Sequence, residues 1–68
     1  MAAYLVNAET DDKGNHEVHT STCTHLPKAQ HRRTLGAFSG CHTALAAARR
    51  YYNKVDGCYY CCKPCHSG

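Results

Sequence analysis

Residues 58–68 read Cys58-Tyr59-Tyr60-Cys61-Cys62-Lys63-Pro64-Cys65-His66-Ser67-Gly68, and this stretch decides how the chain folds. It holds four of the six cysteines in the sequence, as two C-x2-C pairs of which one directly follows the other. A C-x2-C turn presents two sulfur atoms to one point. That arrangement suits zinc, which prefers four thiolate or imidazole ligands in a tetrahedron. The segment is therefore predicted to be a metal-binding knuckle.

A second ligand pair, His19-x3-Cys23, lies far earlier in the sequence. Together the two regions predict one zinc ion bound by a Cys3His set, made of His19, Cys23, Cys62 and Cys65. Because the two C-x2-C pairs adjoin, Cys61 or His66 could take the place of Cys62, and the sequence leaves that choice open. Such an ion would join the first part of the chain to its last part and so stabilise the fold.

The remaining cysteines support other interpretations. Cys41 is expected to pack as a small apolar side chain at the start of a helix, and a Cys41–Cys58 disulfide is an alternative. Since one zinc ion needs only three of the six cysteines, Cys41, Cys58 and Cys61 also suggest thiol chemistry: alkyl acceptance, redox sensing or metal handling. Residues 62–66 match the C-x-x-C-H pattern of covalent haem attachment. The small core and the lack of an export signal argue against haem.

Length and composition explain why a covalent or metal link is needed. The chain has 68 residues, which is room for a single domain, so residues 1–68 are predicted to form one zinc-binding domain. The apolar fraction of 43% is made largely of Ala, Cys and Tyr, and Ile and Trp are absent. A core this poor usually requires metal or disulfides. No apolar run approaches a membrane span and no secretory signal is recognisable, so a cytoplasmic location with reduced thiols is expected.

Local patterns predict a small α+β fold. Residues 4–7, 17–19 and 34–38 are expected to form a short antiparallel sheet of about three strands. Residues 41–52 are rich in Ala, Leu and Arg and predict the main helix, with Ser39 as its N-cap. The buried side of this helix is predicted to carry Cys41, Ala44, Leu45, Ala48 and one or both of Tyr51 and Tyr52.

Charge is distributed unevenly along the chain. Residues 1–17 carry one Lys against four acidic side chains, a net charge of −3. Residues 18–68 carry seven Lys and Arg against one Asp, a net charge of +6. The basic residues include Arg32, Arg33, Arg49 and Arg50. They are expected either to form a solvated surface that keeps a small protein soluble or to bind nucleic acid or an acidic protein.

Several of these motifs together resemble a known family. His19-x3-Cys23, the segment Arg33-Thr34-Leu35-Gly36-Ala37-Phe38-Ser39 with the helix after it, Gly57, Tyr59 and Cys62-x2-Cys65 resemble the zinc domain of the bacterial DNA-repair protein Ada and its small relatives. The resemblance covers roughly residues 16–66 and implies a short sheet with one packed helix and one zinc ion.

The resemblance also bears on activity. In the Ada domain the first residue of the early pair is a zinc-bound cysteine that accepts a methyl group. The matching residue here is His19, and imidazole cannot take over that role. The resemblance thus implies a structural site and no methyl transfer. The sequence as a whole predicts a small, non-enzymatic zinc-binding protein.

Overall fold

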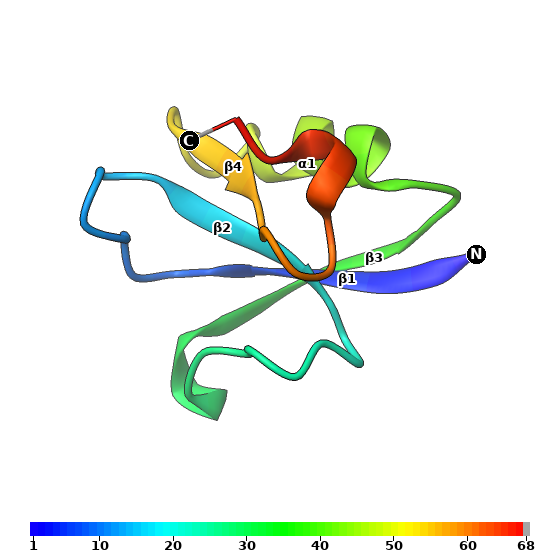
Figure 1. Ribbon diagram of the computed structural model, residues 1–68, viewed down its shortest axis with the longest axis horizontal. Coiled ribbons are helices and arrows are strands. Elements are labelled where there is room, and N and C mark those ends of the chain that lie inside the picture. Colours follow the sequence, from blue (N-terminus) through cyan, green and yellow to red (C-terminus); the bar gives the residue numbers. More distant parts are fainter. Residues whose placement is uncertain (68) are drawn as a thin grey trace.

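The structure is a computed structural model that describes residues 1–67, and it is an α+β fold, as predicted. Within those residues a four-stranded sheet in the order β3-β1-β2-β4 packs against one α-helix (Figure 1). The elements are β1 (Ala2–Asn7), β2 (His16–Thr20), the 3-10 turn η1 (Ala29–His31), β3 (Arg32–Phe38), α1 (Cys41–Ala48), β4 (Val55–Gly57) and the 3-10 turn η2 (Lys63–Cys65).

The sheet is mixed, whereas the sequence predicts an antiparallel sheet of about three strands. β1 pairs antiparallel with β2 and with β3, and β4 pairs parallel with β2. Residues 55–57, which follow the predicted helix, were not predicted to form a strand. A strand of three residues that contains Asp and Gly has almost no periodic signal, and both residues are poor strand formers. Pairing with β2 makes it a strand.

The helix is shorter than predicted. It ends at Ala48, and its N-cap is Gly40 in place of the predicted Ser39. After Ala48 the hydrogen-bond pattern becomes that of a 3-10 turn: the N–H of Tyr51 donates to the carbonyl of Ala48, three residues earlier, at 3.0 Å. The ring of Tyr52 then stacks on His16 of β2, with ring centroids 3.7 Å apart.

The core lies between α1 and one face of the sheet. The first four residues of the predicted helix stripe are buried there, whereas the side chain of Tyr51 is 50% exposed. They pack with Tyr4, Val6 and Val18 of β1 and β2. Burial of these small and medium side chains is what attaches the helix to the sheet.

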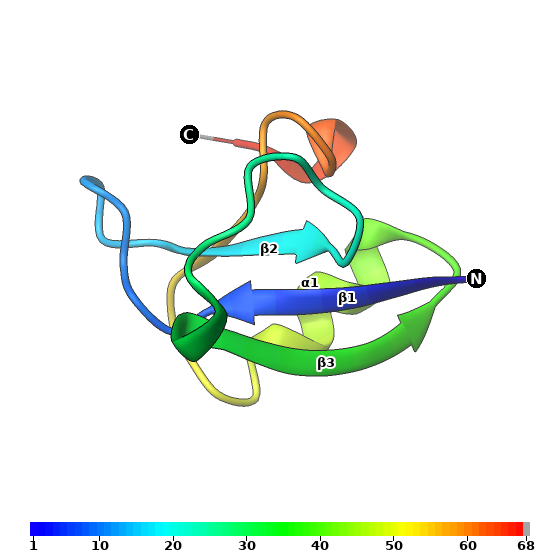
Figure 2. The same cartoon turned by 90° about the horizontal axis from the view of Figure 1, so that it is seen from below.

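The opposite face of the sheet is also covered. Leu5 and His19 are cross-strand partners in β1 and β2, and both are buried. Figure 2 shows the segment that follows β2, with η1, in front of the sheet and α1 behind it. β1 is therefore buried on both faces, and this second face is where the predicted early ligand pair lies. Among residues 1–67, no helix is long and apolar enough to cross a membrane.

Candidate metal centre

The pairing of β4 with β2 brings the two ends of the site together. Their parallel register aligns Val18 with Gly57, so that His19 and Cys58 come next on neighbouring strands. The N–H of Cys58 continues this pairing by donating to the carbonyl of Val18 at 2.9 Å. A three-residue strand thus carries a cysteine far along the chain to the buried histidine of β2.

Four side chains meet at this point, and we call them the His19 cluster: His19, Cys23, Cys58 and Cys61. Their ligand atoms all lie within 4.8 Å of one another. The Sγ atoms of Cys23 and Cys58 are 3.9 Å apart, and Sγ of Cys61 is 3.9 Å from Nδ1 of His19. Two thiolates on a tetrahedral zinc ion with ~2.3 Å bonds would be about 3.8 Å apart. The cluster could therefore hold a metal ion of this size.

Each sulfur in the His19 cluster also accepts one backbone N–H. The N–H of His25 donates to Cys23 (3.4 Å) and that of Tyr60 donates to Cys58 (3.4 Å), in both cases from two residues further along the chain. The N–H of Thr20 donates to Cys61 (3.3 Å). Such donors stabilise a thiolate more than a thiol, since they place positive hydrogen atoms against the sulfur.

The histidine of the cluster is held in the form that binds metal. Burial lowers the pKa of His19, with a smaller lowering from the charge of His25, so the imidazole is neutral near pH 7. Its Nε2 lies 3.8 Å from a carboxylate oxygen of Glu17. Burial, followed by repulsion from Asp11 and other carboxylates, raises the pKa of Glu17. Burial likewise raises the pKa of Cys23, so a bound cation is what would favour its thiolate.

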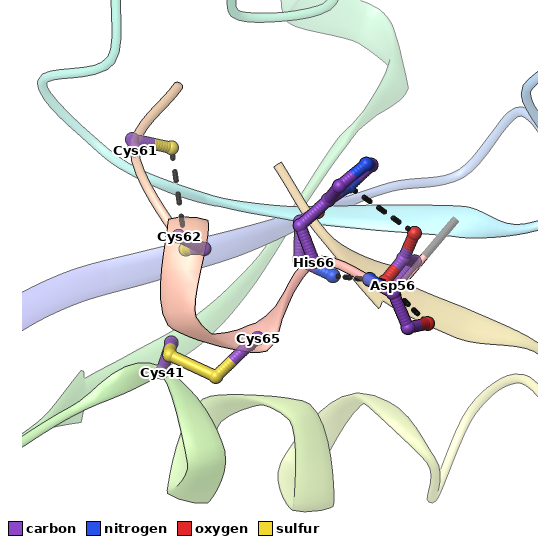
Figure 3. The surroundings of a disulfide bond; sticks show 8 residues. Cys41, Asp56, Cys61, Cys62, Cys65 and His66 are labelled. Carbon is purple, nitrogen blue, oxygen red and sulfur yellow. Dashed lines mark hydrogen bonds and ion pairs between the residues drawn. A yellow bond between two sulfur atoms is a disulfide. The ribbon is translucent and has the colours of Figure 1, made fainter. Parts of the chain in front are cut away.

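The structure brings together only two of the four predicted ligands, His19 and Cys23. Cys62 is 1% exposed and packs in the core on the helix side of the sheet, with its Sγ 4.0 Å from that of Cys61. Cys65 forms a disulfide with Cys41 (Figure 3). Cys41 is thus buried, as expected, but it is also bonded. The physical reason for the difference is β4, whose register puts Cys58 and not Cys62 beside His19.

His66, the alternative to Cys62, also lies away from the cluster. Its Nδ1 is 2.9 Å from the carbonyl oxygen of Gly57 and 3.4 Å from a carboxylate oxygen of the buried Asp56 (Figure 3). Asp56 in turn accepts hydrogen bonds from the backbone N–H and the hydroxyl of Ser67. These contacts fold the end of the described chain back onto β4.

Gly57 marks the closest approach between β4 and the knuckle. A Cβ atom at this residue would lie 2.8 Å from the carbonyl oxygen of Cys62 and 2.8 Å from Cβ of Cys65. Only glycine allows the backbone of residues 62–65 to pass this close to the strand. The same residue therefore sets the position of the loop that carries Cys58 and Cys61.

The aromatic and basic residues near these elements are largely exposed. Tyr59 and Tyr60 are 49% and 65% exposed, and the ring of Tyr60 stacks on His25. On the other side of the molecule, the guanidinium of Arg33 lies 3.8 Å from the centre of the Tyr51 ring. Tyr51 and Arg50 line a shallow hollow of about 260 Å³ together with Leu35 and Phe38.

The chain matches no protein-family profile, no curated protein and no solved structure. The resemblance to the Ada zinc domain accordingly stays a prediction.

Proposed function

We propose that this protein is a structural zinc-binding domain in which His19, Cys23, Cys58 and Cys61 hold one Zn²⁺ ion. The observation that carries the proposal is the hydrogen bonding of the sulfurs. Three cysteines each accept a backbone N–H, around a common point that a buried, neutral imidazole also faces. Four protein ligands fill a tetrahedron, so no coordination position is left for water or substrate. A site of this kind supports a role in stability and not in catalysis.

The proposed ion would close the fold on the face that lacks the helix. It joins the end of β2 and the loop after it to the loop after β4, across a chain separation of 35 residues between Cys23 and Cys58. Cross-links that close long loops restrict the unfolded chain most. Metal binding would then contribute directly to the free energy of unfolding.

Metal analysis tests this proposal with the disulfide intact. We expect one zinc ion per chain, measured by elemental analysis and native mass spectrometry. Removal of zinc with a strong chelator should lower the melting temperature by at least about 10 °C, because 1 kcal/mol shifts a domain of this size by roughly 4–8 °C. A protein that folds without metal and melts at the same temperature with and without chelator would refute the structural zinc site.

A matched pair of variants tests the ligand assignment. Cys58 and Cys62 are both buried, at 2% and 1% exposure, so a serine in either place disturbs packing to a similar degree. We expect Cys58→Ser to lose zinc and Cys62→Ser to retain it. The reverse result would replace our assignment with the set predicted from the sequence, which uses Cys62 and Cys65.

The basic surface supports a role as a nucleic-acid-binding module. Tyr51 is half exposed, its ring is in contact with the Arg33 guanidinium, and Arg50 lies beside it in the same hollow. An exposed aromatic ring between arginines is a platform on which a base can stack while the cations meet phosphates. Arg49 is also exposed, two residues before Tyr51. Arg32 is exposed as well, but it points toward the loop after β2, where its Nε donates to the Pro27 carbonyl at 2.8 Å.

Binding of fluorescently labelled single-stranded DNA, measured by anisotropy between about 25 and 200 mM salt, tests this role. The affinity should fall steeply with salt, and the double variant Arg33→Ala, Arg50→Ala should bind at least about tenfold more weakly. The control is Lys28→Ala, Lys63→Ala, which removes the same charge from two exposed residues that do not line a hollow with Tyr51. Equal weakening by both pairs would show only a general charge effect. Absence of binding at the lowest salt would refute the role.

Thiol chemistry is the second candidate function, and one observation favours it. Two of the cysteines outside the His19 cluster, Cys41 and Cys65, are bonded to each other. Burial and the charge of Cys61 raise the pKa of the third, Cys62, to about 12, so it is a poor nucleophile at neutral pH. The reversible chemistry available to these residues is therefore oxidation and reduction of the disulfide, and not alkyl acceptance by Cys62.

A further inference from the structure

A second group of metal-binding side chains lies at the start of α1, apart from the His19 cluster. Ligand atoms of Cys41, His42 and Cys65 lie within 4.8 Å of one another. In the oxidised chain the two sulfurs are bonded to each other and cannot bind a cation. We propose that reduction of this disulfide turns the group into a second zinc site, with two thiolates, one imidazole and a fourth position open to solvent.

The backbone already holds the three residues at a suitable separation. The Cα atoms of Cys41 and Cys65 are 6.3 Å apart, one at the first residue of α1 and the other at the end of η2 (Figure 3). Zinc would need the two sulfurs about 3.8 Å from each other, which rotation of the side chains can supply at this separation. His42 follows Cys41 on the same first turn and so comes to the site without any movement of the helix.

The helix terminus favours the charged form of the ligands. No acidic side chain lies in the first turn of α1, and the N-cap residue Gly40 offers no side-chain hydrogen bond. The backbone N–H groups of that turn and the positive end of the helix dipole therefore face Cys41 without a counter-charge. A thiolate at this position is stabilised by both, as in other reactive or ligating cysteines at helix N-termini.

The imidazole of His42 is ready to bind an ion. It is exposed, and within the described chain it takes part in no hydrogen bond, ion pair or ring stack. The other histidines differ: the rings of His16, His25 and His66, for example, contact neighbouring groups. With Cys41 buried and Cys65 only partly so, a reductant would approach from the side of Cys65 and His42.

A dithiol is the reductant that opens the Cys41–Cys65 disulfide in the proposed step. The dithiol gives up two electrons and two protons and becomes a cyclic disulfide, while the Cys41–Cys65 bond is cleaved into two thiols. Zn²⁺ then displaces the two thiol protons to water and forms two zinc–sulfur bonds, and His42 supplies a nitrogen lone pair. Three protein ligands leave one position for water, which is the arrangement of reactive zinc sites and not of closed structural ones.

Zinc stoichiometry in the two redox states tests the inference. The full chain is prepared with the disulfide intact, or reduced with dithiothreitol and desalted without oxygen. Each form is then titrated with Zn²⁺ and weighed by native mass spectrometry. The reduced form should bind one ion more than the oxidised form. The ion count of the oxidised form reports the His19 cluster and the difference reports the second site, so the two proposals fail independently. Equal counts in both states would overturn the second site.

Variants show whether the extra ion is where we infer. His42→Ala keeps the disulfide and the helix. It should lower the affinity for the extra ion by at least roughly a hundredfold, since loss of a residue that only hydrogen-bonds to a ligand already lowers metal affinity 10–100-fold. His31→Ala, a histidine on the other side of the molecule, should retain it. The double variant Cys41→Ser, Cys65→Ser should bind the same number of ions in both conditions. An extra ion that binds His42→Ala with unchanged affinity, or that is still counted in the double variant, contradicts the assignment.

Discussion

Gly57→Ala is the most direct test of how closely the knuckle must pack on β4. The added Cβ would lie 2.8 Å from the Cys62 carbonyl oxygen, 2.8 Å from Cβ of Cys65 and 2.9 Å from its carbonyl carbon. Ordinary contacts between such atoms begin near 3.5 Å, so residues 62–65 must move by more than half an ångström. All three neighbours are backbone or Cβ atoms, and rotation of a side chain cannot relieve the overlap.

Overpacking of this kind costs about 1–3 kcal/mol. For a domain of this size, 1 kcal/mol lowers the melting temperature by roughly 4–8 °C, so Gly57→Ala should melt at least about 4 °C lower. Circular dichroism at saturating zinc with the disulfide intact measures this. Gly40→Ala is the comparison, because a Cβ there would meet nothing within 4 Å and the backbone is extended. Its only cost is that of a poorer N-cap residue, about 0.5–1 kcal/mol. If the two variants melt within 2 °C of each other, the close approach at Gly57 does not add to the cost of an alanine there.

Other expectations concern charge and protonation around the same loops. Glu17→Gln should weaken zinc binding about tenfold in competition with a chelator, because the carboxylate that faces Nε2 of His19 is lost; the exposed Glu9→Gln should have no effect. Cys62, with its pKa raised to about 12, should resist iodoacetamide in the folded protein at pH 9 and react once the chain is unfolded, as peptide mass mapping would show. The Cys62 thiol of the unfolded chain loses its proton near pH 9, whereas that of the folded chain keeps it, so the free energy of unfolding should fall as pH rises from about 9 to 12. In Cys62→Val, chemical denaturation at several pH values should show a smaller fall over this range. An equally steep fall in the variant would contradict the expectation.

The fold class was predictable because its main elements have strong local signals. The helix begins at Cys41 as expected. The apolar run of residues 4–6 and the alternation of Leu35 and Ala37 in residues 34–38 mark the strands. The helix end was misjudged because Arg49 and Arg50 have good helix propensity, whereas the stacking of Tyr52 on His16 is a long-range contact that no local pattern contains. Long-range contacts commonly decide where an element stops.

The candidate site was half predictable. His19 and Cys23 lie on one short segment, and their spacing alone indicates a ligand pair. The choice between Cys58-x2-Cys61 and Cys62-x2-Cys65 depends on the register of β4 against β2. That register could not be predicted, because β4 itself was not predicted from the sequence. Residues 55–57 as a candidate strand would have been the signal, since Cys58 is the first residue after it. The Cys41–Cys65 bond likewise depends on how η2 packs against the start of α1.

The positions of the two cross-links have a consequence for biosynthesis. The disulfide uses Cys65 and the proposed metal centre uses Cys58 and Cys61, all from residues 58–65, while the other partners lie in the first two thirds of the sequence. A growing polypeptide therefore cannot make either connection until that short segment has left the ribosome. Before then, the thiols of Cys23 and Cys41 lack these partners, and an oxidant would meet its best opportunity in that interval. Both cross-links thus wait for the same short segment, residues 58–65, which completes the domain.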